Sequence, residues 1–187
     1  MTLRSDVAEL LAEAGIVDVD VDEAVADEHA RTSAYLRVVS AAASSPSRDR
    51  DRDRDRDRAM VATILRDPHE MGAKVAVVAL VDEIAMRVSG SAEFRRWSDE
   101  LLPEIARFKV AGHRAFIRRR IHDWLFYLSV RDGHAPTSAE LAEVTAWMQR
   151  FLAEASTSPA VLALLAESAT TRKTRNIARN RSRSRPR

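Results

Sequence analysis

The chain has 187 residues, of which 45% are hydrophobic, 30 are Lys or Arg and 28 are Asp or Glu, so its formal net charge is +2. This length suits one ordinary domain with appendages. The absence of cysteine excludes disulfides and thiolate metal sites, and the low content of glycine and proline argues against a fold rich in sheets and turns.

The N-terminal residues alternate charged and apolar side chains, without the apolar core of a secretory signal. No apolar run, Val75–Val81 included, is longer than seven residues, whereas a helix that spans a membrane needs about 20. We therefore expect a cytoplasmic protein with no membrane contact.

Residues 1–43 are predicted to form an acidic helical module. Residues 1–47 contain nine acidic and three basic side chains, a net charge of −6. A short helix is expected from Ser5 to Ala14, where Gly15 ends it. Asp20-x-x-Glu23 resembles a capping box and predicts a second helix that reaches about Ala43.

Residues 44–58 are predicted to be a flexible charged linker. A Ser/Pro stretch precedes a strict Arg-Asp alternation from Arg48 to Arg58, with six arginines and five aspartates. A codon-repeat expansion in solvent explains this segment, and the alternative is an Arg-Asp repeat of the kind found in some RNA-associated proteins. Pairs at i,i+3 join Arg to Asp and favour a transient helix, whereas charges at i,i+4 are alike.

Residues 59–168 are predicted to be a helical bundle that holds the main core. Nine of the ten aromatic residues lie from Phe94 onward, and large aromatic side chains dominate core energetics. Asp67 is the predicted N-cap of a helix whose first residue is Pro68 and which ends at Gly90.

A longer helix is expected from Glu104 to about Arg131, after a short helix that begins at Ser91 and ends before Pro103. Apolar residues recur on one side of this helix and form a stripe: Val110, Ile117, Ile121, Trp124 and Leu128. Such a stripe predicts a homo-oligomer that forms through helix 104–131.

The end of the bundle has two strong helix starts. Thr137-x-x-Glu140 is a capping box after a Gly-Pro turn, and it opens a helix with an apolar face over residues 141–152, which is a second candidate surface for oligomerisation. Ser158-Pro159 opens the last helix of the bundle.

A secondary basic face is predicted on helix 104–131. Arg107, Arg114 and Arg118 are spaced by 7 and 4 residues, which aligns them in a row that can follow a phosphate backbone. The simpler interpretation is a solvated polar face, paired with nearby acidic side chains.

Residues 169–187 are predicted to be a disordered basic tail. Thr171–Arg187 contains eight basic and no acidic side chains, whereas the first 170 residues have a net charge of −6. Residues 172–181 can alternatively extend the preceding helix. The predicted nucleic-acid-binding residues are Arg172, Lys173, Arg175, Arg179, Arg181, Arg183, Arg185 and Arg187.

Uncompensated arginines favour an anionic partner, either a nucleic acid or another acidic molecule. Arginine outnumbers lysine 27 to 3, which indicates a GC-rich genome, so part of the arginine content reflects codon usage. The alternative is a solvated extension without a partner.

A helix-turn-helix over residues 160–167 and 172–181 is a further alternative. This segment lacks a glycine in the turn and has few apolar residues to anchor its second helix.

The sequence contains no catalytic motif. The five histidines lack metal-ligand spacing, and nucleophile elbows and phosphate-binding glycine loops are absent. We therefore expect no catalytic residue, cofactor or metal, and favour a protein that is not an enzyme.

Together these features predict a nucleic-acid-associated accessory or regulatory protein, with a basic tail on an oligomerising helical bundle. The alternative is a helical protein–protein adaptor that binds no nucleic acid.

Overall fold

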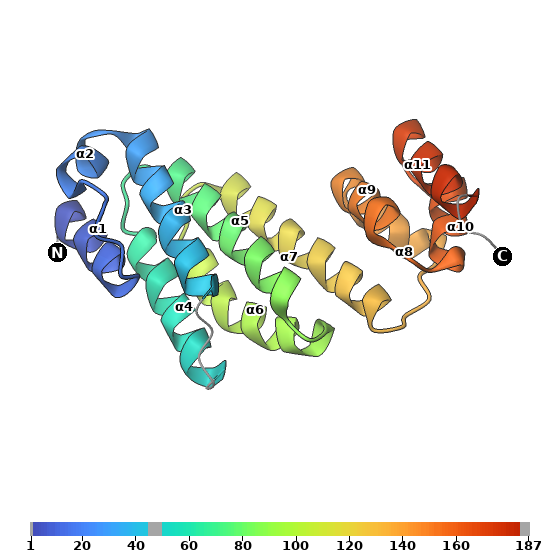
Figure 1. Cartoon of the computed structure of the whole chain (residues 1–187), viewed down its shortest axis with the longest axis horizontal. Coiled ribbons are helices and arrows are strands. Elements are labelled where there is room, and N and C mark those ends of the chain that lie inside the picture. The colour runs from blue at the N-terminus through green and yellow to red at the C-terminus, as the bar shows by residue number, and fades with distance from the viewer. Residues whose placement is uncertain (1, 45–49, 184–187) are drawn as a thin grey trace. The chain divides into compact units, whose positions relative to one another are not determined.

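The computed structural model describes residues 2–44 and 50–183 (Figure 1). Within these ranges every regular element is a helix, which confirms the predicted all-α class. The helices are α1 (Leu3–Glu13), α2 (Val21–Ala26), α3 (Glu28–Ser44), α4 (Arg50–Ile64), α5 (Glu70–Arg87), α6 (Ser91–Ile105), α7 (Ala111–Arg131), α8 (Ser138–Glu143), α9 (Ala146–Ala155), α10 (Pro159–Ser168) and α11 (Arg172–Arg183).

The chain forms two compact units, residues 1–120 and residues 121–187, and the boundary falls inside α7. The first unit includes the predicted acidic module, the predicted linker and the start of the predicted bundle. The second unit includes the rest of that bundle and the predicted tail.

In the first unit, α3 packs along α5, while α1 contacts α2, α3 and α4 (Figure 1). Gly72 allows the close approach of α5 to α3, because a Cβ atom at this position would lie 2.5 Å from Thr32 Oγ1. The largest fully buried side chains of the unit are Tyr35, Ile64, Leu80, Phe94, Leu101, Ile105, Phe108 and Ile117.

A buried ion pair joins α3 to the segment before α5. The Nε of Arg31 donates to Asp67 Oδ2 at 2.6 Å, and the Tyr35 hydroxyl donates to the same oxygen at 3.0 Å. Asp67 was predicted as a helix N-cap, and this prediction is wrong, because α5 begins at Glu70. Its Oδ2 is directed to the cation on α3, while its Oδ1 accepts from the His69 amide in the segment before α5.

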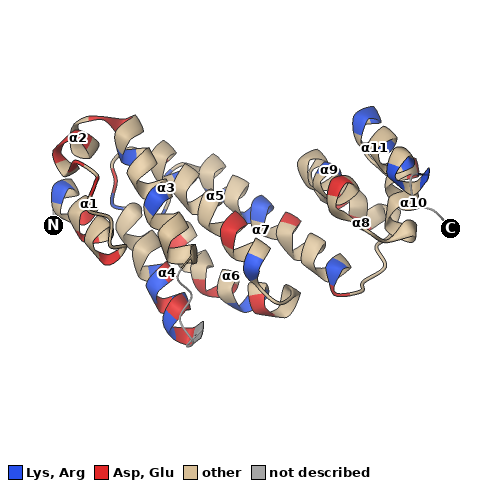
Figure 2. Ribbon diagram, viewed as in Figure 1, with Lys and Arg blue, Asp and Glu red and all other residues tan. Residues whose placement is uncertain are grey.

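The predicted linker is helical where the structure describes it. Residues 50–58 belong to α4, in which acidic and basic residues alternate (Figure 2). The i,i+3 pairs are present, with Arg54 and Asp51 at 2.6 Å. The C-terminal half of α4 packs into the core of the first unit. Its buried positions repeat every three or four residues: Asp57, Met60, Val61 and Ile64. Residues 45–49 lie outside the described part of the chain.

Several predicted helices are shorter because a residue inside the pattern caps a new helix. The helix predicted from Asp20 to Ala43 is interrupted at Asp27, whose side chain accepts from the Ala30 amide at 2.8 Å. In the same way Thr145 separates α8 from α9 and accepts from the Met148 amide. Conversely, α6 continues through Pro103 to Ile105, so the next helix begins at 111 rather than 104.

In the second unit, α11 packs on α9 and α10, and α10 contacts α8. The capping box at Thr137 and the cap at Ser158 are both formed, as predicted. Aromatic rings fill the contact between α7 and α9, where Trp124 meets Phe151 edge to face at 5.2 Å between ring centroids.

The basic tail is ordered through Arg183, which differs from the predicted disorder. A three-residue turn after α10 leads into α11, and the helix buries Thr174 and Ala178 against the rest of the unit. Small side chains suffice here because they let the helix approach closely. Arg185 and Arg187 lie outside the described residues.

The apolar stripe of α7 is part of the protein's own core. Ile117, Ile121, Trp124 and Leu128 are at most 5% exposed, and only Val110, before the helix, is 49% exposed. Residues Leu141, Met148 and Leu152 of the second predicted oligomerisation face are also buried. Most of both surfaces is thus packed within the chain itself, although Trp147 of the second surface is 40% exposed, and the homo-oligomer stays a prediction.

None of the helices within residues 2–44 and 50–183 combines the length and the apolar character needed to cross a membrane.

Candidate functional site

The candidate site is the exposed face of α11, and its position depends on the turn that precedes the helix. Gln149, on α9, is 1% exposed and holds this turn. Its Nε2 donates to the carbonyls of Leu141 and Val144, and its Oε1 accepts from the Thr170 amide at 2.7 Å. Thr171 then caps α11 by accepting from the Thr174 amide.

Two of the tail arginines fasten α11 to its neighbours. Arg175 donates to the carbonyls of Ala169, at 2.6 Å, and Thr170, which follow the end of α10. Arg181 donates to the carbonyls of Ala153 and Ser156 at the end of α9. Both guanidinium groups satisfy carbonyls that a helix end leaves unpaired, and a cation is favourable there.

The remaining basic side chains of α11 are displayed to solvent. Arg172, Asn176, Arg179 and Arg183 are exposed and spaced by 4, 3 and 4 residues, which places them within about 60° of one another around the helix. Lys173 lies exposed beside this row. We call these five residues the α11 basic face.

Within the described part of the chain, no acidic side chain pairs with the cations of the α11 basic face. None of its four cations has an ion pair with a described residue, and residues 168–183 include no Asp or Glu (Figure 2). Arg179 donates to Asn176 Oδ1 at 3.2 Å, which links these two side chains on the surface.

The structure thus divides the predicted tail residues into two groups. Arg172, Lys173, Arg179 and Arg183 share the exposed face, whereas Arg175 and Arg181 are structural. Asn176 was not predicted, although its position four residues after Arg172 signals the same face. Gln149 was missed because nothing in the sequence marks a single glutamine as a link to a turn 21 residues away.

The secondary basic face does not form as the helical spacing predicted. Arg107 precedes α7 and pairs with Glu104 at 2.6 Å. Arg114 donates to the carbonyls of Phe108 and Lys109 and so braces the loop before α7. Arg107 and Arg118 are both exposed, but only Arg118 projects from α7, so the three arginines do not form one row on this helix.

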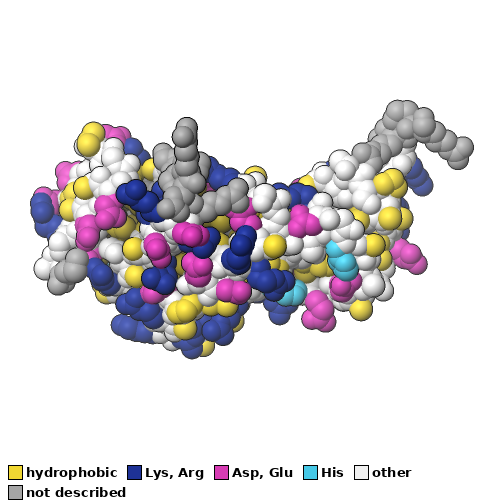
Figure 3. Space-filling model, turned by 90° about the horizontal axis from the view of Figure 1, so that it is seen from below, with side chains coloured by type: hydrophobic (Ala, Val, Ile, Leu, Met, Phe, Trp, Pro, Cys, Tyr) yellow, Lys and Arg dark blue, Asp and Glu magenta, His cyan; other side chains and the backbone are white. Residues whose placement is uncertain are grey.

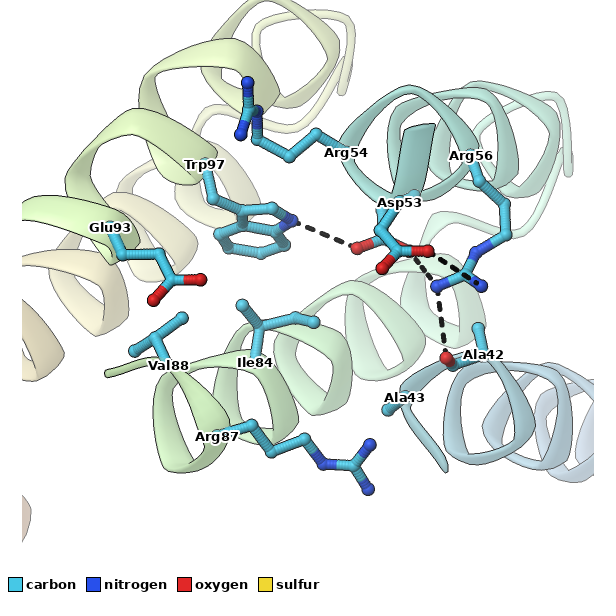
Figure 4. Close-up of a pocket in the computed structure, with 11 residues that line it drawn as sticks. Ala42, Ala43, Asp53, Arg54, Arg56, Ile84, Arg87, Val88, Glu93 and Trp97 are labelled. Carbon is cyan, nitrogen blue, oxygen red and sulfur yellow. Dashed lines mark hydrogen bonds and ion pairs between the residues drawn. The ribbon is translucent and has the colours of Figure 1, made fainter. Parts of the chain in front are cut away.

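The first unit contains a pocket of about 310 Å³ between α3, α4, α5 and α6 (Figure 4). Its charged walls are already paired. Arg54 Nε lies 2.9 Å from Glu100 Oε1, and Arg56 donates to both the Ala42 carbonyl and Asp57. These charged side chains are thus engaged mainly with one another and with the backbone.

Asp57 is the buried acid of this pocket. It accepts from the Trp97 indole N–H at 3.1 Å, yet burial raises the pKa of its carboxyl above the usual range, despite the opposing effects of Arg56 and Trp97. The native state therefore binds more protons than the unfolded state between the two pKa values. Its contribution to stability falls as the pH rises through this interval.

We therefore expect Asp57→Asn to gain stability relative to the wild type as the pH rises from about 4 toward 7. The amide oxygen can still accept from Trp97. Urea unfolding of both proteins at several pH values measures this difference, with Asp55→Asn, at an exposed position of α4, as the matched control. A difference that shrinks with rising pH would contradict the burial argument.

Metal binding and charged surfaces elsewhere on the molecule were the other candidate sites. No three His, Asp or Glu residues within residues 2–44 and 50–183 are placed to hold a metal ion. On the face of the molecule in Figure 3, basic and acidic side chains are interspersed. The α11 basic face differs in carrying one sign of charge.

Comparisons with known proteins give no match: no family model fits the chain, and neither curated proteins nor solved structures yield a significant similarity.

Proposed function

We propose that this protein binds nucleic acid through the α11 basic face, as an accessory or regulatory protein. The proposal depends on one observation: some arginines of α11 bind backbone carbonyls of the neighbouring helices, and the others are exposed. Arg175 and Arg181 fix the helix to α10 and α9, so the four displayed cations stand on a rigid element. Preorganised groups lose less conformational entropy when they bind.

The distribution of charge supports the same unit as the binding unit. Residues 121–187 contain ten basic and six acidic side chains, a net charge of +4, and the remaining residues 1–120 have a net charge of −2. An anionic polymer is therefore attracted to the second unit, and the first unit is left for contacts with a regulatory partner.

We expect Arg172→Gln/Arg179→Gln/Arg183→Gln to weaken binding on the order of 100-fold at 0.15 M salt, because each lost phosphate contact removes the release of condensed counterions. The slope of log K against log salt should become shallower by about 2.7 on duplex DNA. Fluorescence anisotropy with a labelled 25-base-pair duplex and a 25-nucleotide RNA measures both quantities.

The matched control is Arg95→Gln/Arg96→Gln/Arg150→Gln, which removes three exposed positive charges from α6 and α9. If both triple variants lose affinity equally, total charge and not the α11 basic face determines binding. Deletion of residues 171–187 is a poorer test, because it also removes the buried Thr174 and Ala178.

The adaptor alternative has one observation in its favour. Met71, Val110 and Phe116 of the first unit are exposed by 45% or more, and Lys74 stacks over the Phe116 ring at 4.2 Å. Met71 and Val110 line the same surface hollow, and contiguous exposed apolar side chains are typical of protein contacts. If the wild type binds neither probe even at low salt, the adaptor becomes the better proposal.

A further inference from the structure

Helices α10 and α11 have the connectivity of a helix-turn-helix. Residues 159–168 form α10, residues 169–171 form the turn, and α11 follows and packs on α10. In this motif two helices are joined by a turn of three or four residues, and the second helix enters the major groove of DNA. The sequence provides no glycine in this turn, but Gln149 and Arg175 hold its backbone from outside.

The exposed side of α11 has the dimensions of a groove-reading helix. The row from Arg172 to Arg183 extends about 16 Å along the helix axis, and an α-helix with its side chains is about 10–12 Å across. The major groove of B-form DNA is about 12 Å wide and accepts an α-helix. The buried side of α11 faces α9 and α10 through Thr174 and Ala178, so the basic side is the one available to a groove.

The side chains on this face are suited to reading bases as well as phosphates. Arginine pairs with the O6 and N7 atoms of guanine, and asparagine pairs with the N6 and N7 atoms of adenine, both in the major groove. Asn176 lies in the middle of the row, between Arg172 and Arg179. In the free protein its Oδ1 accepts from Arg179 at 3.2 Å, so pairing with adenine exchanges this bond.

The same region lacks the groups that recognise unpaired bases. Within α11 itself there is no aromatic residue. The rings of Trp147 and Phe151 on the neighbouring α9 pack against each other and against Trp124. The α11 basic face therefore has no ring of its own as the stacking platform on which single-stranded nucleic acids are bound. Duplex RNA is also disfavoured, because the major groove of its A-form helix is too narrow for side chains to read.

From these observations we propose that α10 and α11 form a helix-turn-helix that binds duplex DNA, with α11 in the major groove and Asn176 as a base-reading residue. This inference rests on the proposed function and narrows its ligand from nucleic acid in general to duplex DNA.

The first experiment compares three labelled probes of equal length at 0.15 M salt: random-sequence duplex DNA, duplex RNA and single-stranded DNA. We expect duplex DNA to bind at least tenfold more tightly than either of the others. Equal or tighter binding of a different probe overturns the inference and leaves the proposed function intact. No binding to any probe removes both.

The second experiment tests the groove. Wild-type protein selects sites from a random duplex pool, and the selected duplex is then made with 7-deazaadenine, which lacks the N7 acceptor in the major groove but keeps the phosphate charge. We expect this substitution to weaken wild-type binding about tenfold, and Asn176→Ala to lose that sensitivity without a change in salt slope.

Ser138→Ala, at an exposed position of α8, is the control and should retain the full sensitivity to 7-deazaadenine. If the wild type selects no sequence, or if every 7-deazaadenine position is neutral, α11 does not read adenine in the major groove and the inference is overturned. Since Asn176 is uncharged, this result leaves the electrostatic part of the proposed function standing.

Discussion

Asp67→Ala is expected to lower the free energy of unfolding by about 3–5 kcal/mol, because it leaves a buried cation without its counter-charge. Arg31 and Asp67 are 3% and 5% exposed, and their atoms approach to 2.6 Å. The Tyr35 hydroxyl, which donates to the same oxygen, also loses its acceptor.

The surrounding bonds indicate why this site is sensitive. The Nη1 of Arg31 donates to the carbonyls of Ala24 and Val25 at 3.1 Å, so the guanidinium joins the end of α2 to the segment before α5. Burial, together with the charge of Asp67, raises the pKa of Tyr35 and keeps its hydroxyl protonated as a donor.

Asp18→Ala is the matched control, because Arg37 and Asp18 also lie 2.6 Å apart but are exposed to solvent. Exposed pairs contribute little, so this variant should unfold as the wild type does. Urea unfolding combined with hydrogen exchange of α3 measures the losses. Arg31→Met/Asp67→Leu should recover part of the stability, and equal losses for Asp67→Ala and Asp18→Ala would refute the ion-pair argument.

Gln149→Leu is expected to destabilise the second unit by about 3 kcal/mol, because one substitution leaves several buried backbone groups without partners. The shape of the side chain is nearly kept, so the loss reports hydrogen bonding and not a cavity. The Thr170 amide loses its acceptor, and the carbonyls of Leu141 and Val144 lose their donor.

The effect should appear first in α11, because Thr170 lies in the turn that leads into it. We expect amide exchange in residues 174–178 to become about 100-fold faster, which corresponds to the same free energy. Arg150→Leu changes the neighbouring exposed position of α9 and should leave the exchange unchanged. Unaltered exchange in Gln149→Leu would show that the turn does not depend on this side chain.

The helix starts that could be predicted from sequence are those made by local contacts. Thr137 and Ser158 cap their helices within three residues, and Gly15 and Gly133 have the positive φ angles of 68° and 106° that favour glycine at these turns. Such signals are complete in a short stretch of sequence, so the pattern was sufficient.

Two of the predicted helix boundaries that were wrong depend on partners far along the chain. Thr145 interrupts a continuous helical pattern because its amide and hydroxyl bond to the carboxylate of Asp123, 22 residues earlier. Asp67 has the appearance of a cap, but its partner Arg31 is 36 residues away. In each case the local sequence contains the side chain but not the distant partner that determines what this side chain binds.

The candidate site was predictable in charge but not in arrangement. The excess of arginine after residue 170 is visible in the sequence, but which arginines are displayed depends on the phase of α11. That phase is set by Thr174 and Ala178, which are too small to be recognised as core residues by their hydrophobicity.

The structure of α4 has a consequence for how this gene can change over time. Insertion of one Arg-Asp dipeptide anywhere in a pure repeat gives the same sequence, and Asp57 and Met60 are fixed in the core by the C-terminal half of the helix. Added or lost dipeptides therefore change only the helix end nearest residue 50, by about 3 Å per dipeptide. Slippage during DNA replication can vary this repeat between strains without altering the packing of the first unit.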